Sequence, residues 1–307
     1  MQIQLVSVWA KVRYGKKGER VVKDTRGQKI FAIFNYLIIT ALVIITLYPF
    51  WHIVMASLSN PSQLMAHNGL VLKPLGFSTA AYQQVLNDST IIRSFLNTLF
   101  IIVTKNTLSI LLTLFGAYFL SRKDIMAAPA VSFLIVVTMF FSGGLVPTYL
   151  NVRDLHLDNR FGALIFPTVL NTFNLIILRT GFWGVPDSLE ESARLDGAGD
   201  MRILFNILVP LILPSIMVVA LYYIVATWNS WFDAMIYLRK RELFPLQLIL
   251  REILVESQAK ADSGDMETTT ETIQYAVMTV STVPILLVYP FMQKYFVKGA
   301  TVGAVKG

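Results

Sequence analysis

Long apolar runs separated by polar stretches are the main pattern of the chain. Six of these runs are long enough to cross a bilayer as a helix, which takes about 20 apolar residues. They lie near residues 30–52, 93–120, 129–149, 162–180, 207–228 and 274–293. The pattern predicts an all-α membrane protein with six transmembrane helices. An even number of spans would place both termini on one side of the membrane.

The polar stretch between the fourth and fifth runs, residues 186–206, predicts two short helices. Ser188 and Glu191 have the spacing of a capping box, in which each side chain accepts a free backbone N–H at a helix start. Gly197 predicts the end of this helix, because glycine tolerates a left-handed backbone conformation. A second amphipathic turn is predicted from about Asp200. Two short helices joined at a glycine predict a docking element on the cytoplasmic side.

Two longer polar segments, residues 55–92 and 229–273, would lie on the outer side. The first contains a predicted short helix at 80–86. Within the second, residues 256–271 include almost no apolar side chains. Such a composition buries too little surface to fold alone, so we predict a mobile loop there; a specific docking site is the alternative.

The composition agrees with a membrane protein. Hydrophobic residues make up 55% of the chain and charged residues only 15%, with a mean hydropathy of +0.59, whereas soluble domains carry about 25% charged residues. The absence of cysteine excludes disulfides and thiolate metal sites. Three histidines lie far apart in the sequence and predict no metal site: His52, His67 and His156.

The distribution of Lys and Arg predicts the topology. Residues 1–29 form a basic tail, and such charges favour the cytoplasmic side. We therefore expect a cytoplasmic tail over 1–29, a transmembrane domain over 30–296 and a cytoplasmic tail over 297–307. The net charge of +7 then follows from topology and does not indicate nucleic acid. The basic segment 239–241 opposes this bias, because it would lie outside.

Motifs of catalysis are missing from the sequence. It contains no phosphate-binding loop, no nucleophile elbow and no zinc-binding helix, so we expect no enzyme activity and no cofactor bound by this chain. Lys105 is the one obvious ionisable residue within a span, and we expect it to snorkel or to pair with a companion subunit. An ion-coupled secondary carrier needs more such groups and stays as the alternative, as does a membrane scaffold. A transporter driven by a separate ATPase predicts an inner docking element.

The sequence resembles a known family in several motifs. Glu191-Ser192-Ala193, Gly197 and Ile207-Leu208-Val209-Pro210 are similar to the EAA loop of ABC importer permeases, with Ser192 and Val209 as departures. Three further segments resemble motifs of carbohydrate permeases: LDGAG at 195–199, WNSWF at 228–232 and YFVKGATVGAVKG at 295–307. Two more resemble the subgroup for complex oligosaccharides: FSGGLVPTYL at 141–150 and PLQLILREIL at 245–254.

This resemblance implies a translocation subunit of an ATP-driven oligosaccharide importer in a bacterial plasma (inner) membrane, with residues 30–296 as its permease domain. Its partners would be a second homologous permease, two ATPase subunits that bind ATP and Mg, an extracellular solute-binding lipoprotein and membrane lipids. The implied ATPase contacts are the following residues of the docking loop: Glu190, Glu191, Ser192, Ala193, Arg194, Asp196, Gly197 and Ala198. Val305, Lys306 and Gly307 would reach the same interface. For Glu191, a charge pair with an ATPase arginine and the capping box both stay open.

Aromatic residues suggest a substrate path, since sugars stack on aromatic rings. Trp228, Asn229, Trp231 and Tyr237 cluster in the sequence where the fifth span meets the outer side. Anchoring in the membrane interface explains aromatic residues at this position as well. Both interpretations stay open from the sequence.

Overall fold

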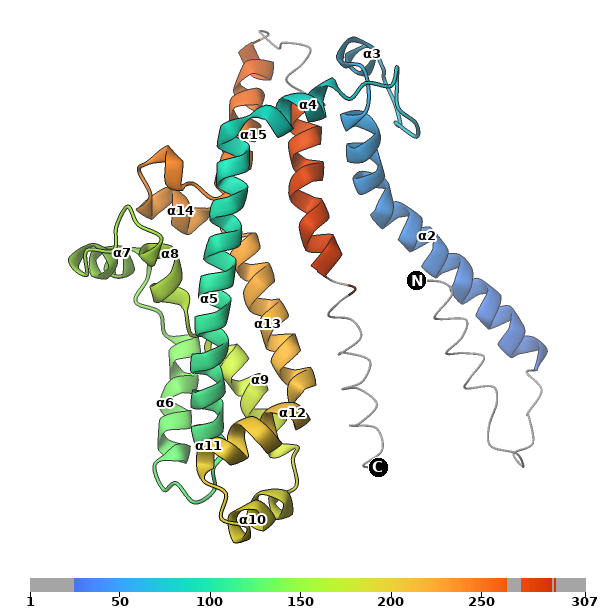
Figure 1. The fold of residues 1–307 in the computed structure, drawn as a ribbon. Coiled ribbons are helices and arrows are strands. Elements are labelled where there is room, and N and C mark those ends of the chain that lie inside the picture. Colours follow the sequence, from blue (N-terminus) through green and yellow to red (C-terminus); the bar gives the residue numbers. More distant parts are fainter. Residues whose placement is uncertain (1–24, 264–271, 289, 291–307) are drawn as a thin grey trace. The chain divides into compact units, whose positions relative to one another are not determined.

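The computed structural model describes residues 25–263, 272–288 and 290 of the chain (Figure 1). Helices and their connections account for all of this part, and it contains no strand. The all-α prediction is therefore confirmed for the described residues. The chain divides into two compact units, one ending at His52 and one beginning at Ile53. Each is described by itself.

Helix α2 (Arg26–Ser57) extends for about 48 Å, at 1.5 Å per residue, and its residues up to His52 belong to the first unit. It continues through Pro49 without a break. None of its most apolar stretch is buried, and large side chains such as Phe34 and Leu42 are exposed. A helix of this length and composition can cross a bilayer, so the span predicted at 30–52 is confirmed.

Helix α5 (Ser89–Ser121) is the central element of the second unit. Asp88 caps it by accepting a hydrogen bond from the Thr90 N–H at 2.7 Å. Helices α9 (Thr172–Trp183) and α13 (Leu213–Trp228) pack against α5 (Figure 1). Their shared core includes Leu114, Leu178, Leu204, Leu208 and Val219. The span predicted at 93–120 is confirmed.

The span predicted at 129–149 is bent in the structure. Helix α6 (Ala128–Phe140) ends early, and α7 (Leu145–Asp154) leaves it at 114°. Gly144 joins them with a φ of +86°, a conformation that favours glycine. The predicted span can still cross a membrane as one bent pair, but hydropathy alone does not give the bend.

The other two broken spans contain proline. In the run at 162–180, a short helix α8 (Gly162–Ile165) and a 3₁₀ turn meet α9 at 51°, and Pro167 in that turn cannot donate a helical hydrogen bond. In the run at 207–228, the helical segment ending with α12 (Val209–Leu211) meets α13 at 82°.

By helix length and composition, fewer segments of the structure qualify as membrane spans than the six predicted. Two helices are long and apolar enough to cross a membrane, and up to five if each bent pair counts as one. The helix Thr272–Val288 corresponds to the sixth predicted run but falls below that length. Residues 289 and 291–293 of that run lie outside the described residues.

The polar segments contain more helix than predicted. Helix α3 (Pro61–Met65) was not anticipated, whereas α4 (Ala80–Asn87) confirms the short helix at 80–86. Helix α15 (Leu246–Ser263) continues into the acidic stretch, so a loop over 256–263 is wrong. Extending an existing helix costs less than starting one, which explains the difference. Residues 264–271 lie outside the described part.

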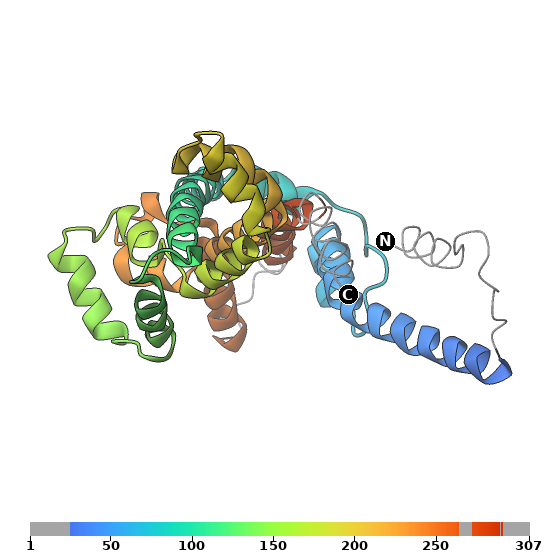
Figure 2. The ribbon, with the colours of Figure 1, turned by 90° about the horizontal axis from the view of Figure 1, so that it is seen from below.

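The two ends of α5 contact different segments of the chain. Near its start, Asn97 Nδ2 donates to the backbone oxygens of Glu242 and Phe244 at 2.8 and 3.1 Å. Just after its last residue, Arg122 contacts helix α10 (Asp187–Leu195). The 25 residues between Asn97 and Arg122 correspond to about 37 Å of helix, which exceeds the hydrocarbon thickness of about 30 Å. Figure 2 views this unit from the α10 end.

Candidate functional site

Helix α10 begins differently from the prediction. Pro186 occupies the N-cap with φ −62° and ψ 130°, and no side chain caps the helix. Ser188 is therefore the second residue of the helix, and the capping-box prediction is wrong. Asp187 and Glu190 lie in the first turn, where negative charge interacts favourably with the helix dipole.

The end of α10 confirms the predicted stop at Gly197. The Ala198 N–H donates to Ala193 O at 2.9 Å, and the Gly197 N–H donates to Arg194 O at 3.0 Å. This pair of bonds is a Schellman motif, which needs a left-handed residue at the glycine position, and Gly197 has a φ of +79°. The chain then enters the predicted second helix, α11 (Asp200–Ile203).

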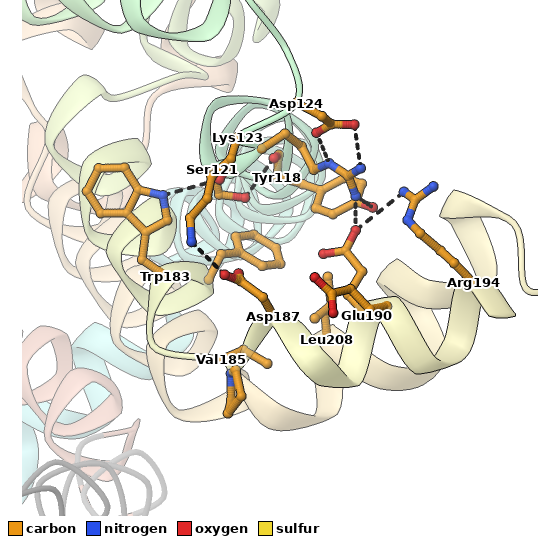
Figure 3. A pocket seen from close by; sticks show the side chains of 14 residues that line it. Tyr118, Ser121, Lys123, Asp124, Trp183, Val185, Asp187, Glu190, Arg194 and Leu208 are labelled. Atoms are coloured by element: carbon orange, nitrogen blue, oxygen red, sulfur yellow. Dashed lines mark hydrogen bonds and ion pairs between the residues drawn. The ribbon is translucent and has the colours of Figure 1, made fainter.

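A group of charged side chains holds α10 to the end of α5 (Figure 3). The Arg122 guanidinium donates to Glu190 on α10. It also donates to both carboxylate oxygens of Asp124 at 2.8 Å and to the Tyr118 hydroxyl at 3.1 Å. The side chains of Arg122 and Glu190 are only 13% and 24% exposed. We call Tyr118, Arg122, Asp124 and Glu190 the α5–α10 clasp.

Two exposed ion pairs support the clasp. Lys123 Nζ donates to Asp187 Oδ2 at 2.6 Å, with both side chains mostly exposed. Arg194 donates to Asp200, which links α10 to α11. Hydrogen bonds from Arg122 lower the pKa of Asp124 to about 2, so this carboxylate stays charged over the whole physiological range.

The sequence did not single out Arg122 as a site residue. The signal was nevertheless present, as a basic pair directly after a long span. Glu190 has a partner within the chain that the sequence did not predict. Its carboxylate faces Arg122 within the chain, whereas the sequence grouped it with the residues that face an ATPase.

A pocket of about 570 Å³ lies between the end of α5 and α10. Glu191 belongs to its lining and is exposed, and within the described residues its carboxylate makes no hydrogen bond or ion pair. Beyond it, Leu195 is 89% exposed and Met201 is also exposed. Apolar side chains at the tip of a polar loop indicate a surface that a partner covers, and the sequence did not point to these two.

The remaining predicted docking residues divide between surface and interior. Ser192, Asp196 and Gly197 are exposed, whereas Ala193 is buried beside Ile203. Ala198 is half-buried against the same core. Val305, Lys306 and Gly307 lie outside the described residues.

The predicted substrate-path residues do not form one surface. Trp228 is buried edge-to-face against Phe95, and Tyr237 is buried and stacked on Tyr149 with ring centroids 6.1 Å apart. These two rings belong to separate cores. Trp231 is half-buried under the Arg251 guanidinium, 3.6 Å from its ring centroid.

These contacts by themselves indicate neither stacking of a sugar on the rings nor anchoring of the rings in the membrane interface. Asn229 Nδ2 donates to the backbone oxygen of Val225 at 3.0 Å, which is a local bond. The described contacts show how Trp228 and Tyr237 pack, and the substrate path stays a prediction.

Lys105 is buried within the chain. Its side chain lies among residues of α5, α8 and α13, beside a small space lined by Thr98, Thr227 and Ser230, and the residue is 8% exposed. Asp233 lies within electrostatic range of it. This burial contradicts the expectation that Lys105 snorkels or reaches a companion subunit.

Apolar helices around one long span, with a polar helical loop fastened to the end of that span, define the class of helical membrane proteins. Residues 124–302 match the family described as "Binding-protein-dependent transport system inner membrane component". The chain belongs to this family. The resemblance to ABC importer permeases is thereby confirmed.

Individual relatives agree with this assignment. The chain is 41% identical to the polygalacturonan/rhamnogalacturonan transport system permease protein YtcP of Bacillus subtilis (strain 168), over 90% of this chain and 97% of that protein. It is 36% identical to Protein LplC of the same organism, over 92% and 97%. Among solved structures, a bacterial ABC transporter for import of the acidic polysaccharide alginate superposes with a TM-score of 0.82 at 32% identity, covering 90% of this chain and 99% of that one.

Proposed function

We propose that this chain is the translocation subunit of an ATP-driven oligosaccharide importer, and that a separate ATPase moves it through α10. The bent helix pairs, the two long helices and the helix Thr272–Val288 would together make six crossings. The loop 186–206 and both termini would face the cytoplasm. The chain itself carries out no hydrolysis.

The observation that carries this proposal is the division of α10 into two faces. Its inner face is occupied, because Ala193 is buried and Glu190 is bound to Arg122. Its outer face presents the carboxylate of Glu191, which pairs with no residue in the described part of the chain, and the exposed side chain of Leu195. An arginine in a cleft of the ATPase would pair with Glu191, and apolar side chains of that cleft would cover Leu195.

The family description supports the rest of the assembly, since it names a binding-protein-dependent system. A second homologous permease would complete the translocation path. Two ATPase subunits would bind ATP and Mg, and an extracellular solute-binding lipoprotein would deliver the sugar. The C-terminal residues 305–307 would reach the ATPase interface.

We further propose that the substrate is an acidic oligosaccharide. The relatives provide the support: one is named for polygalacturonan and rhamnogalacturonan, and the solved importer acts on the acidic polysaccharide alginate. Each of these polymers carries sugar carboxylates. Oligogalacturonate is accordingly the first substrate to test.

Glu191→Ala is expected to weaken coupling between ATP hydrolysis and uptake by ten- to a hundredfold. A hydrogen bond to a charged group contributes roughly 1.5–3 kcal/mol, and 1.4 kcal/mol is a factor of ten. The measurement is uptake and ATP hydrolysis by the complete importer in liposomes. Membrane insertion should be unaffected, because Glu191 has no partner in the described part of its own chain.

Ser188→Ala is the matched control on the same helix. It should behave like the natural protein, since Ser188 makes no capping bond. Normal coupling in Glu191→Ala would remove the docking assignment. Uptake driven by an imposed ion gradient without any ATPase would instead favour the secondary-carrier alternative.

A further inference from the structure

A basic tripeptide, Arg239-Lys240-Arg241, lies at the end of α5 opposite α10, next to the segment that Asn97 binds. All three residues are exposed. If α10 is cytoplasmic, this tripeptide faces outward. Lys and Arg normally favour the cytoplasmic side of a membrane protein, so these charges need a reason other than topology.

The backbone of the tripeptide is fixed by one side chain from a distant segment. Asn159 Oδ1 accepts hydrogen bonds from the backbone N–H groups of both Arg239 and Lys240, each at 3.0 Å. The Asn159 N–H donates to Tyr237 O at 2.8 Å. Asn159 itself has a φ of +53°, which is uncommon for a residue other than glycine. The two basic side chains therefore project from a rigid base.

Two of the three charges of the tripeptide have no ion-pair partner among the described residues. Arg241 lies 3.2 Å from Glu252 and is paired. Arg239 and Lys240, and Arg160 beside Asn159, make no ion pair with any residue that the structure describes. Asp158 also precedes Asn159, but it offsets at most one of these three charges. Unpaired cations on a fixed backbone suit an anionic ligand.

We propose that Arg239 and Lys240 form an outer cationic site for the carboxylates of an acidic oligosaccharide. This inference rests on the proposed function and adds the residues that would bind the carboxylates of the substrate. A guanidinium binds a carboxylate through two parallel hydrogen bonds, and the ammonium adds a point charge. Because both groups are exposed, they hold the sugar weakly and raise its local concentration before it enters the path.

The test is uptake by the complete importer, with its binding protein, of oligogalacturonate and of methyl-esterified oligogalacturonate of the same length. The double variant Arg239→Gln/Lys240→Gln is expected to raise KM for the charged sugar roughly fivefold or more, with kcat within about twofold. Its KM should also depend less on ionic strength, because exposed charges are screened by salt. Transport of the neutral ester should not change.

Lys73→Gln provides the matched control, since Lys73 is an exposed lysine in the other segment predicted to lie outside. This change should leave both substrates unaffected. Direct binding of oligogalacturonate to the detergent-purified importer, without binding protein, is measured in parallel and should be lost in the double variant.

Two results would overturn the cationic site. One is equal behaviour of charged and esterified sugar in the natural and variant proteins. The other is weaker binding of the solute-binding protein, regardless of its ligand's charge, which would assign the tripeptide to protein docking. If the natural importer binds oligogalacturonate at this site but imports neither sugar, the proposed function is refuted and the cationic site stands.

Discussion

Gly197→Pro is expected to lower coupled transport by about two orders of magnitude. Proline fixes φ near −65° and has no N–H, whereas Gly197 has a φ of +79° and donates to Arg194 O. Loss of the left-handed conformation and of the hydrogen bond together costs about 3 kcal/mol, roughly a hundredfold in the population of the docked loop. The measurement is uptake per ATP hydrolysed in liposomes, together with the amount of inserted protein.

Two serine variants separate backbone strain from steric effects. A Cβ at Gly197 or at Gly199 would meet no atom within 4 Å, so neither site is crowded. Gly199 has an ordinary φ of −76° and is the N-cap of α11, a position where serine is favoured. Gly197→Ser should therefore reduce coupling about tenfold, while Gly199→Ser should not. Equal effects at both glycines would contradict this account of the loop.

Glu190→Ala is expected to reduce coupled transport roughly thirtyfold while ATP hydrolysis continues. The Arg122–Glu190 pair is mostly covered, so its loss should cost about 2 kcal/mol, between the values for exposed and buried pairs. Helix α10 would remain folded through its Schellman motif, but among the described ion pairs only the exposed Lys123–Asp187 pair would still link it to the end of α5. Movement of the ATPase would then be transmitted less to the long span.

Asp124→Asn and Lys123→Gln are the controls for the clasp. Asp124 binds Arg122 but does not reach α10, and Lys123 reaches α10 through an exposed pair, which contributes little. Both variants should keep coupling within about twofold. If either is as damaging as Glu190→Ala, the clasp does not act through Glu190.

Hydropathy predicted α2 and α5 well, because both are long and uninterrupted. It could not predict the bends at Gly144 or between α12 and α13, since an average over 20 residues is the same for a straight and a folded helix. A proline such as Pro167 marks a break in a helix, but it does not give the angle of the bend. Those angles follow from the packing of each half on its neighbours.

In the docking loop, local sequence signals predicted the helices but not which side chains face inward. Its two helices and the glycine stop followed from local signals, and the stop is confirmed by the φ of Gly197. Glu190 and Glu191, however, differ by only about 100° around α10. Which one faces inward depends on Arg122, which lies 68 positions earlier in the sequence, and no local pattern contains that contact.

One crosslinking measurement tests most directly whether a separate ATPase drives this chain at α10. The chain has no cysteine, so Leu195→Cys provides a single thiol at the most exposed apolar position of the loop. We expect it to crosslink to an ATPase subunit in the assembled importer and to resist a membrane-impermeant maleimide added outside intact cells. Labelling from outside, or failure to crosslink with any ATPase subunit, would contradict the account.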